Sequence, residues 1–228
     1  MGKATAMILA AGRGDRMRPL TDTLPKPLLE VAGKPLVVHQ IEALARAGHR
    51  DIAINASHLA QKLVDALGDG RRLGVTLHWS IEPEPLETLG GIATARPMLA
   101  DGPLLVVSGD LWTAYDYGAL EARRPSVRRS MHLVMVPNPP YHPRGDFTLD
   151  GPRLATGGSH ALTYGNIGLY DAALFDELPR GEKLKLLPLM LDLIRDGRAT
   201  GEYYSGPWAN LGTPDDLAQL EAALSHPR

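Results

Sequence analysis

The sequence contains no cysteine among its 228 residues, and aromatic residues make up only 5% of it. Without cysteine, neither a disulfide framework nor a thiolate metal site can form. The formal net charge of −2 excludes the broad positive field that draws proteins to nucleic acid or to anionic membranes, so we expect neither partner. A phosphate-binding site would have to be built locally, from a few cations.

Long hydrophobic runs are also missing from the sequence. No apolar stretch approaches the roughly 18–20 residues that are needed to span a bilayer. Residues 1–9 are too short and too polar at their start for a signal peptide. We therefore expect a cytoplasmic protein, as a monomer or a small homo-oligomer.

Strand-like and helix-like segments alternate through the first half of the chain. Short apolar runs predict strands at 5–9, 51–55, 75–79 and 104–107. Apolar residues at helical spacing predict helices at 36–47, 59–67 and 91–99. This alternation predicts an α/β fold, with a Rossmann-like mixed, mostly parallel sheet and flanking helices.

The second half is less regular. Residues 131–136 are strand-like, and residues 137–143 hold four prolines and must form a loop. Asp150-Gly151 is a turn signal between short strands, and residues 186–194 are helical. Thr213 followed by Pro214 predicts an N-cap and a helix that reaches about Leu224. Because no linker interrupts the chain, we predict a single domain over residues 1–228.

The most informative stretch follows the first predicted strand. Its small residues and glycines let the backbone approach a ligand, and successive N–H groups can cradle phosphate oxygens. This predicted cradle consists of Ala10, Ala11, Gly12, Arg13 and Gly14. Arg16 offers a planar fork to phosphate and Lys26 a compact charge, which Pro25 and Pro27 hold in place. Neither a Walker A motif nor the G-x-G-x-x-G fingerprint fits, because no Gly-Lys-Ser/Thr follows and Met17 fills the third glycine position.

The string from Leu9 to Thr21, followed by Pro25-Lys26-Pro27, resembles the signature of the sugar-1-phosphate nucleotidyltransferase family. That signature is L-A-A-G-x-G-x-R-[ML]-x-P-L-T and then P-K-P. The resemblance implies a glycosyltransferase-A-like fold and the joining of a nucleoside triphosphate to a sugar 1-phosphate. It also implies that Arg16 meets the triphosphate and that Lys26 meets the reacting phosphates. The nucleotide-binding half would then be about 1–115 and the sugar-binding half about 116–228.

A carboxylate, Asp110, follows the apolar run at 104–107 and is therefore expected at the carboxyl edge of the sheet. It could hold Mg²⁺ or merely cap a turn. The resemblance implies a catalytic metal ligand at Asp110. The string from Trp208 to Thr213 resembles a second family motif, W-x-D-x-G-T, but Asn210 replaces its metal-binding aspartate. We expect Mg²⁺ at Asp110 and Asn210 with weakened affinity, or an Asn210 that only caps the turn before the Thr213 helix.

Base and sugar contacts are expected elsewhere. Residues 82–91 resemble the family's base-binding segment, which implies roles for Glu82, Thr88, Gly90 and Gly91. Asn55 ends a predicted strand and is expected to line the nucleotide pocket, although such an asparagine often only forms a turn. The candidate sugar contacts are Asp146, Asn166 and Lys185. The eight histidines show no metal-ligand spacing, so we expect surface or packing roles for all of them.

Within the family, three strings resemble the bacterial N-acetylmuramate-1-phosphate uridylyltransferase branch, which acts in the recycling of cell-wall sugars. They are 109–113, 115–117 and 144–147. The resemblance favours UTP and N-acetylmuramate 1-phosphate as substrates. GTP with mannose 1-phosphate, and dTTP or UTP with glucose 1-phosphate, stay open. So does a regulatory subunit that only binds nucleotide-sugars, because Asn210 weakens the metal site. A glycosyltransferase is disfavoured, because no Asp-x-Asp motif is present.

Overall fold

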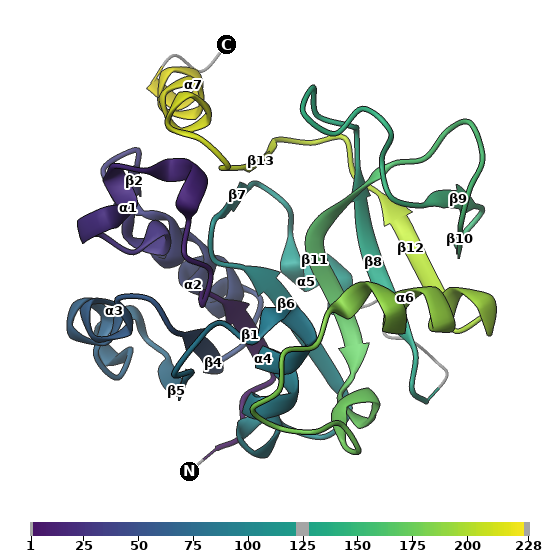
Figure 1. Ribbon diagram of the computed structural model, residues 1–228, viewed down its shortest axis with the longest axis horizontal. Coiled ribbons are helices and arrows are strands. Elements are labelled where there is room, and N and C mark those ends of the chain that lie inside the picture. The colour runs from purple at the N-terminus through teal and green to yellow at the C-terminus, as the bar shows by residue number, and fades with distance from the viewer. Residues whose placement is uncertain (1, 122–127, 226–228) are drawn as a thin grey trace.

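A single nine-stranded sheet runs through the computed structural model, which describes residues 2–121 and 128–225. Its order is β5-β4-β1-β6-β11-β8-β12-β10-β9, so the strands of both halves belong to one sheet (Figure 1). The strands are β1 Ala6–Leu9, β4 Asp51–Ala56, β5 Thr76–Ile81, β6 Pro103–Ser108, β8 Met131–Val136, β9 Thr148–Asp150, β10 Arg153–Ala155, β11 Thr163–Asp171 and β12 Ala199–Tyr203.

The sheet is mixed and mostly parallel, as predicted. The first-half strands β5, β4, β1 and β6 pair in parallel. Strand β11 is antiparallel to both β6 and β8, and β12 is parallel to β8. Because β10 and β9 also pair antiparallel, seven of the nine described strands point in one direction and β11 and β10 point in the other. The carboxyl ends of those seven strands therefore meet at one edge of the sheet.

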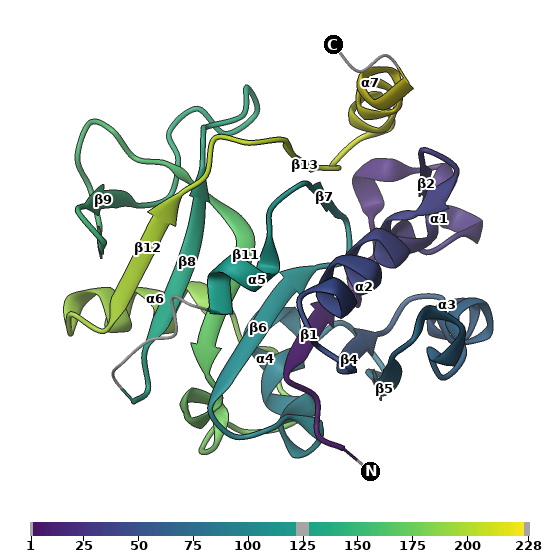
Figure 2. The same cartoon turned by 180° about the vertical axis from the view of Figure 1, so that it is seen from behind.

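Helices cover both faces of the sheet. Figure 2 shows α2 and α5 on one face, and Figure 1 shows α6 on the other. The side chains of α4 and α6 share a buried apolar cluster, and those of α2 and α5 share another. The described α-helices are α1 Leu20–Thr23, α2 Leu36–Arg46, α3 Ala60–Leu67, α4 Glu87–Ala95, α5 Tyr117–Glu121, α6 Leu186–Arg195 and α7 Pro214–Ser225. The short 3₁₀ helices are η1 Asp15–Met17, η2 Lys26–Leu28, η3 Arg71–Leu73, η4 Arg96–Met98 and η5 Ala172–Phe175.

The helix α2 illustrates how the sequence pattern produces these elements. Val37, Ile41 and Leu44 recur at helical spacing, and all three are fully buried against the sheet. The helix ends before Gly48, whose φ of 98° few other residues adopt. The His49 N–H then donates back to the Leu44 carbonyl oxygen at 3.0 Å, which satisfies one of the last helix carbonyls.

The C-terminal helix α7 returns to the first half of the chain. Leu211 and Leu220 are buried in one cluster with Met17, Leu29 and Val31. In addition, the Ala32 N–H of the β2–β3 hairpin (β2 Glu30–Val31, β3 Lys34–Pro35) donates to Glu221 Oε2 at 2.7 Å. The predicted N-cap is confirmed, since Thr213 Oγ1 accepts the Asp216 N–H at 3.3 Å. By sequence, α7 belongs to the predicted sugar-binding half, which begins near residue 116. In the structure it packs against the predicted nucleotide-binding half.

Several predicted boundaries differ from the structure. The helix expected at 91–99 begins at Glu87 and gives way to the 3₁₀ helix η4 at Arg96. The long strand β11 and the strand β12 lie where no strand was predicted. Two further strands, β7 Leu111–Thr113 and β13 Trp208–Asn210, pair antiparallel outside the main sheet.

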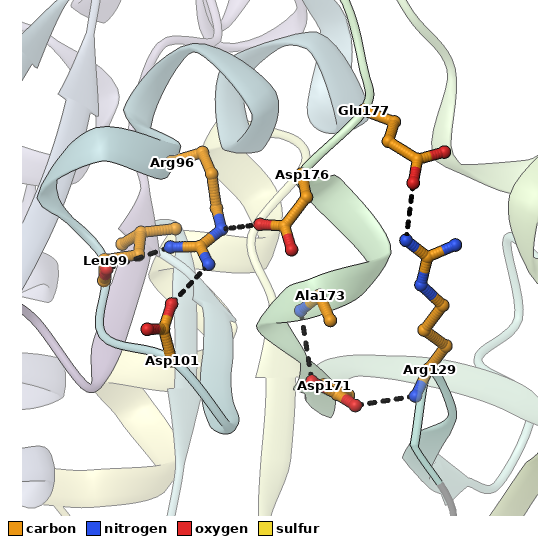
Figure 3. A network of polar contacts seen from close by, with 8 residues as sticks. All are labelled: Arg96, Leu99, Asp101, Arg129, Asp171, Ala173, Asp176 and Glu177. Carbon is orange, nitrogen blue, oxygen red and sulfur yellow. Dashed lines mark hydrogen bonds and ion pairs between the residues drawn. The ribbon is translucent and has the colours of Figure 1, made fainter.

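The edge of the sheet that lies away from the carboxyl ends is held by ion pairs (Figure 3). Arg96, whose side chain is 10% exposed, donates to Asp176 at 2.7 Å, to Asp101 at 2.6 Å and to the Leu99 carbonyl at 3.0 Å. Asp101 precedes β6 and Asp176 follows β11, so this arginine ties the two halves of the sheet together. No helix of the described residues is long and apolar enough to cross a membrane.

Candidate active site

A cleft of about 1020 Å³ opens at the carboxyl edge of the sheet. It is bordered by the loops that follow β1, β6 and β8, and by the first residues of β11, which enters this edge because it runs antiparallel. Its volume is at the upper end of the range for a small-molecule site and gives room for two substrates side by side. Open α/β sheets bind ligands at this edge.

The glycine loop after β1 forms one wall of the cleft. Gly14 has a φ of 69°, and a Cβ there would lie 3.0 Å from Thr21 Cγ2 and 3.2 Å from Lys26 Cβ. Its carbonyl oxygen accepts the Thr21 hydroxyl and the Met17 N–H, both at 2.8 Å. Gly12, in contrast, faces open space, with nothing within 4 Å of a Cβ position. The turn is therefore tight at Gly14 and leaves the backbone at Gly12 open to a ligand.

Lys26 and Asp110 meet at the bottom of this wall. Lys26 Nζ lies 2.5 Å from Asp110 Oδ2, and Ser108 Oγ donates to Asp110 Oδ1 at 2.5 Å. The lysine side chain is 10% exposed and the aspartate side chain 25% exposed. Both groups line the cleft, so each remains in reach of a ligand while the two neutralise each other.

Asn210 is brought beside Asp110 by the small β7–β13 pair. Asn210 lies opposite Leu111 in that pair, and the Leu211 N–H donates to the Asp110 carbonyl at 3.2 Å. Asn210 Oδ1 is buried and has no hydrogen-bond partner among the described residues. It caps no turn, because Thr213 and Asp216 supply the cap of α7. A buried, unpartnered amide oxygen beside a carboxylate suits an oxygen-ligated cation such as Mg²⁺.

The described residues contain no group of three or more His, Cys, Asp or Glu side chains placed to hold a metal. Asp110 and Asn210 would therefore supply only one carboxylate and one amide oxygen. Mg²⁺ commonly binds one or two protein oxygens and takes its remaining ligands from substrate phosphates and water. The donor set fits a metal that is completed by a nucleotide.

Arg16 lies at the mouth of the cleft, next to the C-terminal segment. A Cβ on Gly212 would lie 3.2 Å from Arg16 Nη1 and 3.3 Å from Asp216 Oδ2, so the guanidinium packs directly over that glycine. The fork of Arg16 is exposed and lines the cleft. Residues from the two ends of the chain thus build this part of the site.

A buried polar network supports the loop from behind. Asn55, 3% exposed, accepts the Ala10 N–H at 2.9 Å and donates to Glu82 Oε1 at 2.7 Å, while the Leu86 N–H donates to Glu82 Oε2 at 3.0 Å. Burial raises the pKa of the Glu82 carboxyl, and the two hydrogen bonds oppose that rise. A Cβ on Gly91 would lie 2.6 Å from Asn55 Nδ2 and 2.8 Å from Glu82 Oε1. This glycine therefore lets α4 pack against the network.

The other predicted base-binding glycine also has a packing role. A Cβ on Gly90 would lie 2.1 Å from the Glu182 carbonyl oxygen. The N–H groups of Leu89 and Gly90 donate to the Leu184 carbonyl at 3.0 and 3.1 Å. Gly90 thus allows the segment before α6 to dock on the start of α4, next to Thr88, which lines the cleft.

The sugar-half wall is built by Asp146 and Asn166. Asp146 Oδ2 accepts the Tyr164 N–H at 2.8 Å, and Asp146 Oδ1 lies 3.0 Å from His142 Nε2. Asn166 has a φ of 56° and interrupts the β11–β8 register between Tyr164 and Gly168. Asparagine tolerates this left-handed conformation, and such a bulge re-aims a side chain next to a binding site.

Tyr141 reaches across the cleft from the proline-rich loop. Burial is the main cause that raises the pKa of its hydroxyl, and the charges of Asp216 and Asp110 act in the same direction. The Arg16 guanidinium and the Asn210 amide oppose that rise. The hydroxyl is therefore close to the residues of the opposite wall, although Tyr141 as a whole is 54% exposed.

Most of the residues predicted from sequence come together in this cleft. Those that line it are Ala10, Ala11, Gly12, Gly14, Arg16, Lys26, Asn55, Thr88, Asp110, Asp146, Asn166, Lys185 and Asn210. Four predicted residues lie outside its lining, namely Arg13, Glu82, Gly90 and Gly91. For the last three, the buried network and the helix packing described above give the physical reason.

Sequence reasoning missed other residues of the lining. Among them are Asp15, Glu87, Ser108, Tyr141, His142, Thr163, Tyr164, Trp208 and Gly212. His142 is the histidine that departs from the expected surface or packing role. Tyr141 and His142 lie in the loop that follows β8, at the carboxyl end of that strand, and this position was a signal that could have indicated them.

The chain is similar to known proteins over most of its length. A family model described as nucleotidyl transferase matches residues 5–145, which is more than half of the chain. An N-acetylmuramate alpha-1-phosphate uridylyltransferase from Neisseria meningitidis is 44% identical and covers 95% of this chain and 96% of its own. A mannose-1-phosphate guanyltransferase from Schizosaccharomyces pombe is 42% identical, but over 51% of this chain and 33% of its own.

A solved structure shares the fold. The Bacillus anthracis protein assigned as a glucose-1-phosphate thymidylyltransferase superposes with a TM-score of 0.85 at 20% identity, over 96% of this chain and 94% of its own. At that identity the likeness concerns the fold alone. The family match, the extensive relative and the cleft at the carboxyl edge together show that this chain belongs to the nucleotidyl transferase family.

Proposed function

We propose that this protein transfers UMP from UTP to N-acetylmuramate 1-phosphate, with release of pyrophosphate. The observation that carries the proposal is one cleft that holds Arg16, Lys26, Asp110 and Asn210 in a chain that matches a uridylyltransferase relative almost from end to end. That relative is named for N-acetylmuramate alpha-1-phosphate. The guanyltransferase relative matches only about half of this chain. It therefore supports a shared nucleotide-binding half and does not bear on the choice of sugar substrate.

The reaction we propose is a direct displacement. A phosphate oxygen of the sugar 1-phosphate attacks the α-phosphorus of UTP, the new O–P bond forms, and the bond between the α-phosphorus and the bridging oxygen of pyrophosphate breaks. The attacking oxygen is already an anion, so little help from a general base is needed. Catalysis then rests on alignment of the two substrates and on neutralisation of charge.

Three residues would perform that task. The Arg16 fork would bind the triphosphate at the cleft mouth, and Lys26 would bring the two reacting anions together. The open backbone at Gly12 would donate N–H groups to phosphate oxygens. Because the Asn55–Glu82 network fixes the start of this loop through the Ala10 N–H, the donors are held in place before substrate arrives.

Asp110 and Asn210 would hold Mg²⁺. When bound, the metal supplies positive charge to the triphosphate and polarises its oxygens. Asp110 contributes the one anionic oxygen and Asn210 a neutral oxygen, so the protein alone offers the cation little charge. We therefore propose that the metal enters mainly as the Mg·UTP complex.

A screen of pyrophosphate release tests this proposal. UTP, GTP, dTTP, ATP and CTP would each be combined with N-acetylmuramate, N-acetylglucosamine, mannose and glucose 1-phosphates, with and without Mg²⁺. We expect the highest kcat/KM for UTP with N-acetylmuramate 1-phosphate, and activity only with metal. A higher kcat/KM for GTP with mannose 1-phosphate would overturn the substrate assignment.

A regulatory subunit is a second candidate, and Asn210 motivates it, because a neutral residue stands where the family motif has a charged metal ligand. The ion-paired Lys26 and Asp110 argue against it, since a protein that only binds product has no need of either group. If no pair in the screen releases pyrophosphate while a nucleotide-sugar binds in calorimetry, the regulatory reading is the correct one.

A further inference from the structure

We propose that Lys185 binds the carboxylate that distinguishes N-acetylmuramate 1-phosphate from N-acetylglucosamine 1-phosphate, and that it thereby sets the sugar specificity of the cleft. The two sugars differ by a lactyl ether on the ring, which ends in that carboxylate. This inference rests on the proposed function, because it names the residue that recognises one group of the proposed substrate. It concerns specificity and assigns Lys185 no part in the displacement itself.

The backbone on both sides of Lys185 is fixed. Leu184 donates its N–H to the Leu86 carbonyl at 3.1 Å, and its own carbonyl accepts two N–H groups from the start of α4. Leu186, the first residue of α6, is 8% exposed and anchors the helix in the core. Lys185 itself is exposed and lines the cleft. The side chain therefore starts from a rigid base beside the sugar half of the cleft.

Two other basic side chains of the cleft already have local partners. Lys26 pairs with Asp110 at 2.5 Å, and His142 lies 3.0 Å from Asp146. The Arg16 guanidinium packs over Gly212 at the triphosphate side of the site. Arg16 and Lys26 are the cations that would bind the phosphates common to every sugar 1-phosphate and nucleotide.

Lys185 has no ion pair and no hydrogen bond among the described residues; Arg16 shares this property, but Lys185 precedes α6 whereas Arg16 follows the glycine loop. The carboxylates of Glu87 and Asp146 line the same cleft, but neither forms an ion pair with Lys185. Lys183, two residues earlier, instead pairs with Glu84 at 2.6 Å and lies outside the cleft lining. A free ammonium group on a rigid base is suited to an additional anionic group of the ligand.

The chemistry of the ligand decides which anion this is. A neutral sugar 1-phosphate carries its charge only on the phosphate, which must lie near Lys26 for the displacement. An N-acetylmuramate ring carries a second anion on another carbon, so it needs a second cation away from the reacting phosphates. A lysine is suited to a flexible lactyl group because its single ammonium charge can follow the carboxylate.

The experiment measures kcat/KM with UTP for N-acetylmuramate 1-phosphate and for N-acetylglucosamine 1-phosphate. It compares the wild type with Lys185→Met, which keeps most of the unbranched side chain and removes the charge, and with Lys183→Met as the matched control. We expect Lys185→Met to lower kcat/KM for N-acetylmuramate 1-phosphate about tenfold or more, as for loss of a charged hydrogen bond. The value for N-acetylglucosamine 1-phosphate should change less than about twofold, and Lys183→Met should leave both values unchanged. Lys185→Arg should restore part of the loss.

Three outcomes overturn the inference. Equal losses for both sugars would place Lys185 on a group that they share, such as the 1-phosphate. No loss of kcat/KM with either sugar would mean that the carboxylate is bound elsewhere. Wild-type protein that does not use N-acetylmuramate 1-phosphate would overturn the proposed function together with this inference, and the wild-type measurement alone distinguishes that failure.

Discussion

Lys26 and Asp110, separated by 84 residues in the sequence, form an ion pair in which Nζ lies 2.5 Å from Oδ2. The pair has a consequence for metal binding. Since the lysine pairs with the Asp110 carboxylate, a free metal ion meets an ion pair and the neutral Asn210 amide in place of a free carboxylate. A metal that arrives with a triphosphate brings its own negative oxygens, and the lysine can then turn to the phosphates.

Removal of the lysine should therefore separate metal binding from catalysis. In Lys26→Met, we expect the nucleotide-free protein to bind Mn²⁺ about tenfold more tightly, because the competing positive charge is gone. The same variant should lose on the order of 100-fold in kcat/KM, because Lys26 no longer stabilises the reacting phosphates. Titration of free Mn²⁺ by electron paramagnetic resonance measures the first effect and steady-state kinetics the second.

The control for this experiment is Lys34→Met. Lys34 pairs with Glu42 at 2.6 Å on the surface and lies outside the cleft lining, so both its Mn²⁺ affinity and its kcat/KM should equal those of the wild type. Weaker Mn²⁺ binding by Lys26→Met would contradict the competition between lysine and metal. A loss in kcat/KM below about fivefold would mean that Lys26 only changes the electrostatic potential of the cleft and does not stabilise the reacting phosphates.

The neutral side chain of Asn210 should also limit the affinity of the site for metal. Asn210→Asp adds a second carboxylate next to Asp110, so we expect the Mg²⁺ concentration at half-maximal rate to fall about tenfold at fixed UTP. The maximal rate need not rise, because the added negative charge also repels the incoming sugar phosphate. Superimposable Mg²⁺ titrations of the two proteins would mean that Asn210 is no metal position.

The sequence predicted the first half of the fold well because its strands are buried on both faces. Runs such as 104–107 show continuous apolar character, and the helices between them repeat at 3.6 residues, as α2 does. The glycine signature after β1 and the aspartate after β6 then fall at one sheet edge by topology alone. These elements required no tertiary information.

The second half could not be predicted in the same way. Strand β11 contains Gly165-Asn166-Ile167-Gly168, which resembles a turn, and only its pairing with β6 and β8 makes it a strand. Glu82 was expected to contact the nucleotide base because residues 82–91 resemble the family's base-binding segment, whereas the structure buries its side chain beneath the loop. Tyr141 and His142 lie in a proline-rich loop, whose path depends on Asn138 and Asp146 rather than on any periodic pattern.

The Glu82 carboxylate accepts one hydrogen bond at each oxygen, so its charge state should matter for nucleotide binding. In Glu82→Gln, one amide N–H meets another donor, either Asn55 Nδ2 or the Leu86 N–H. We expect KM for UTP to rise about tenfold, because Asn55 no longer fixes the Ala10 N–H firmly. Steady-state kinetics at saturating sugar 1-phosphate measures this, and an unchanged KM would remove Glu82 as a positioning residue.

The pH dependence gives an independent check. Burial raises the pKa of Glu82, so the folded protein takes up a proton here at a higher pH than the unfolded chain does. Charged Glu82 therefore lowers the stability above that pKa, and this cost is relieved as the pH falls from the folded pKa to the lower pKa of the unfolded chain. Protonation also removes an acceptor, so KM for UTP should rise in the wild type over the same pH range. In Glu82→Gln, the KM for UTP should not rise over this pH range.

The Arg96 cluster should contribute to stability and not to catalysis. Arg96→Ala leaves Asp176 and Asp101 without their shared partner at the sheet edge that lies away from the cleft. We expect the free energy of unfolding to fall by about 1–3 kcal/mol, while kcat at saturating substrates stays within about twofold of the wild type. Urea unfolding followed by circular dichroism measures the first quantity. A large loss in kcat at full folding would contradict a purely structural role.

The central claim is that the cleft at the carboxyl edge performs metal-dependent nucleotidyl transfer around Asp110. The most direct test is the kcat of Asp110→Asn at saturating Mg²⁺, UTP and N-acetylmuramate 1-phosphate, with circular dichroism to verify the fold. This variant keeps the shape of the side chain and removes its charge. We predict a loss in kcat on the order of 100-fold or more in a folded protein. A kcat within about threefold of the wild type would contradict the account.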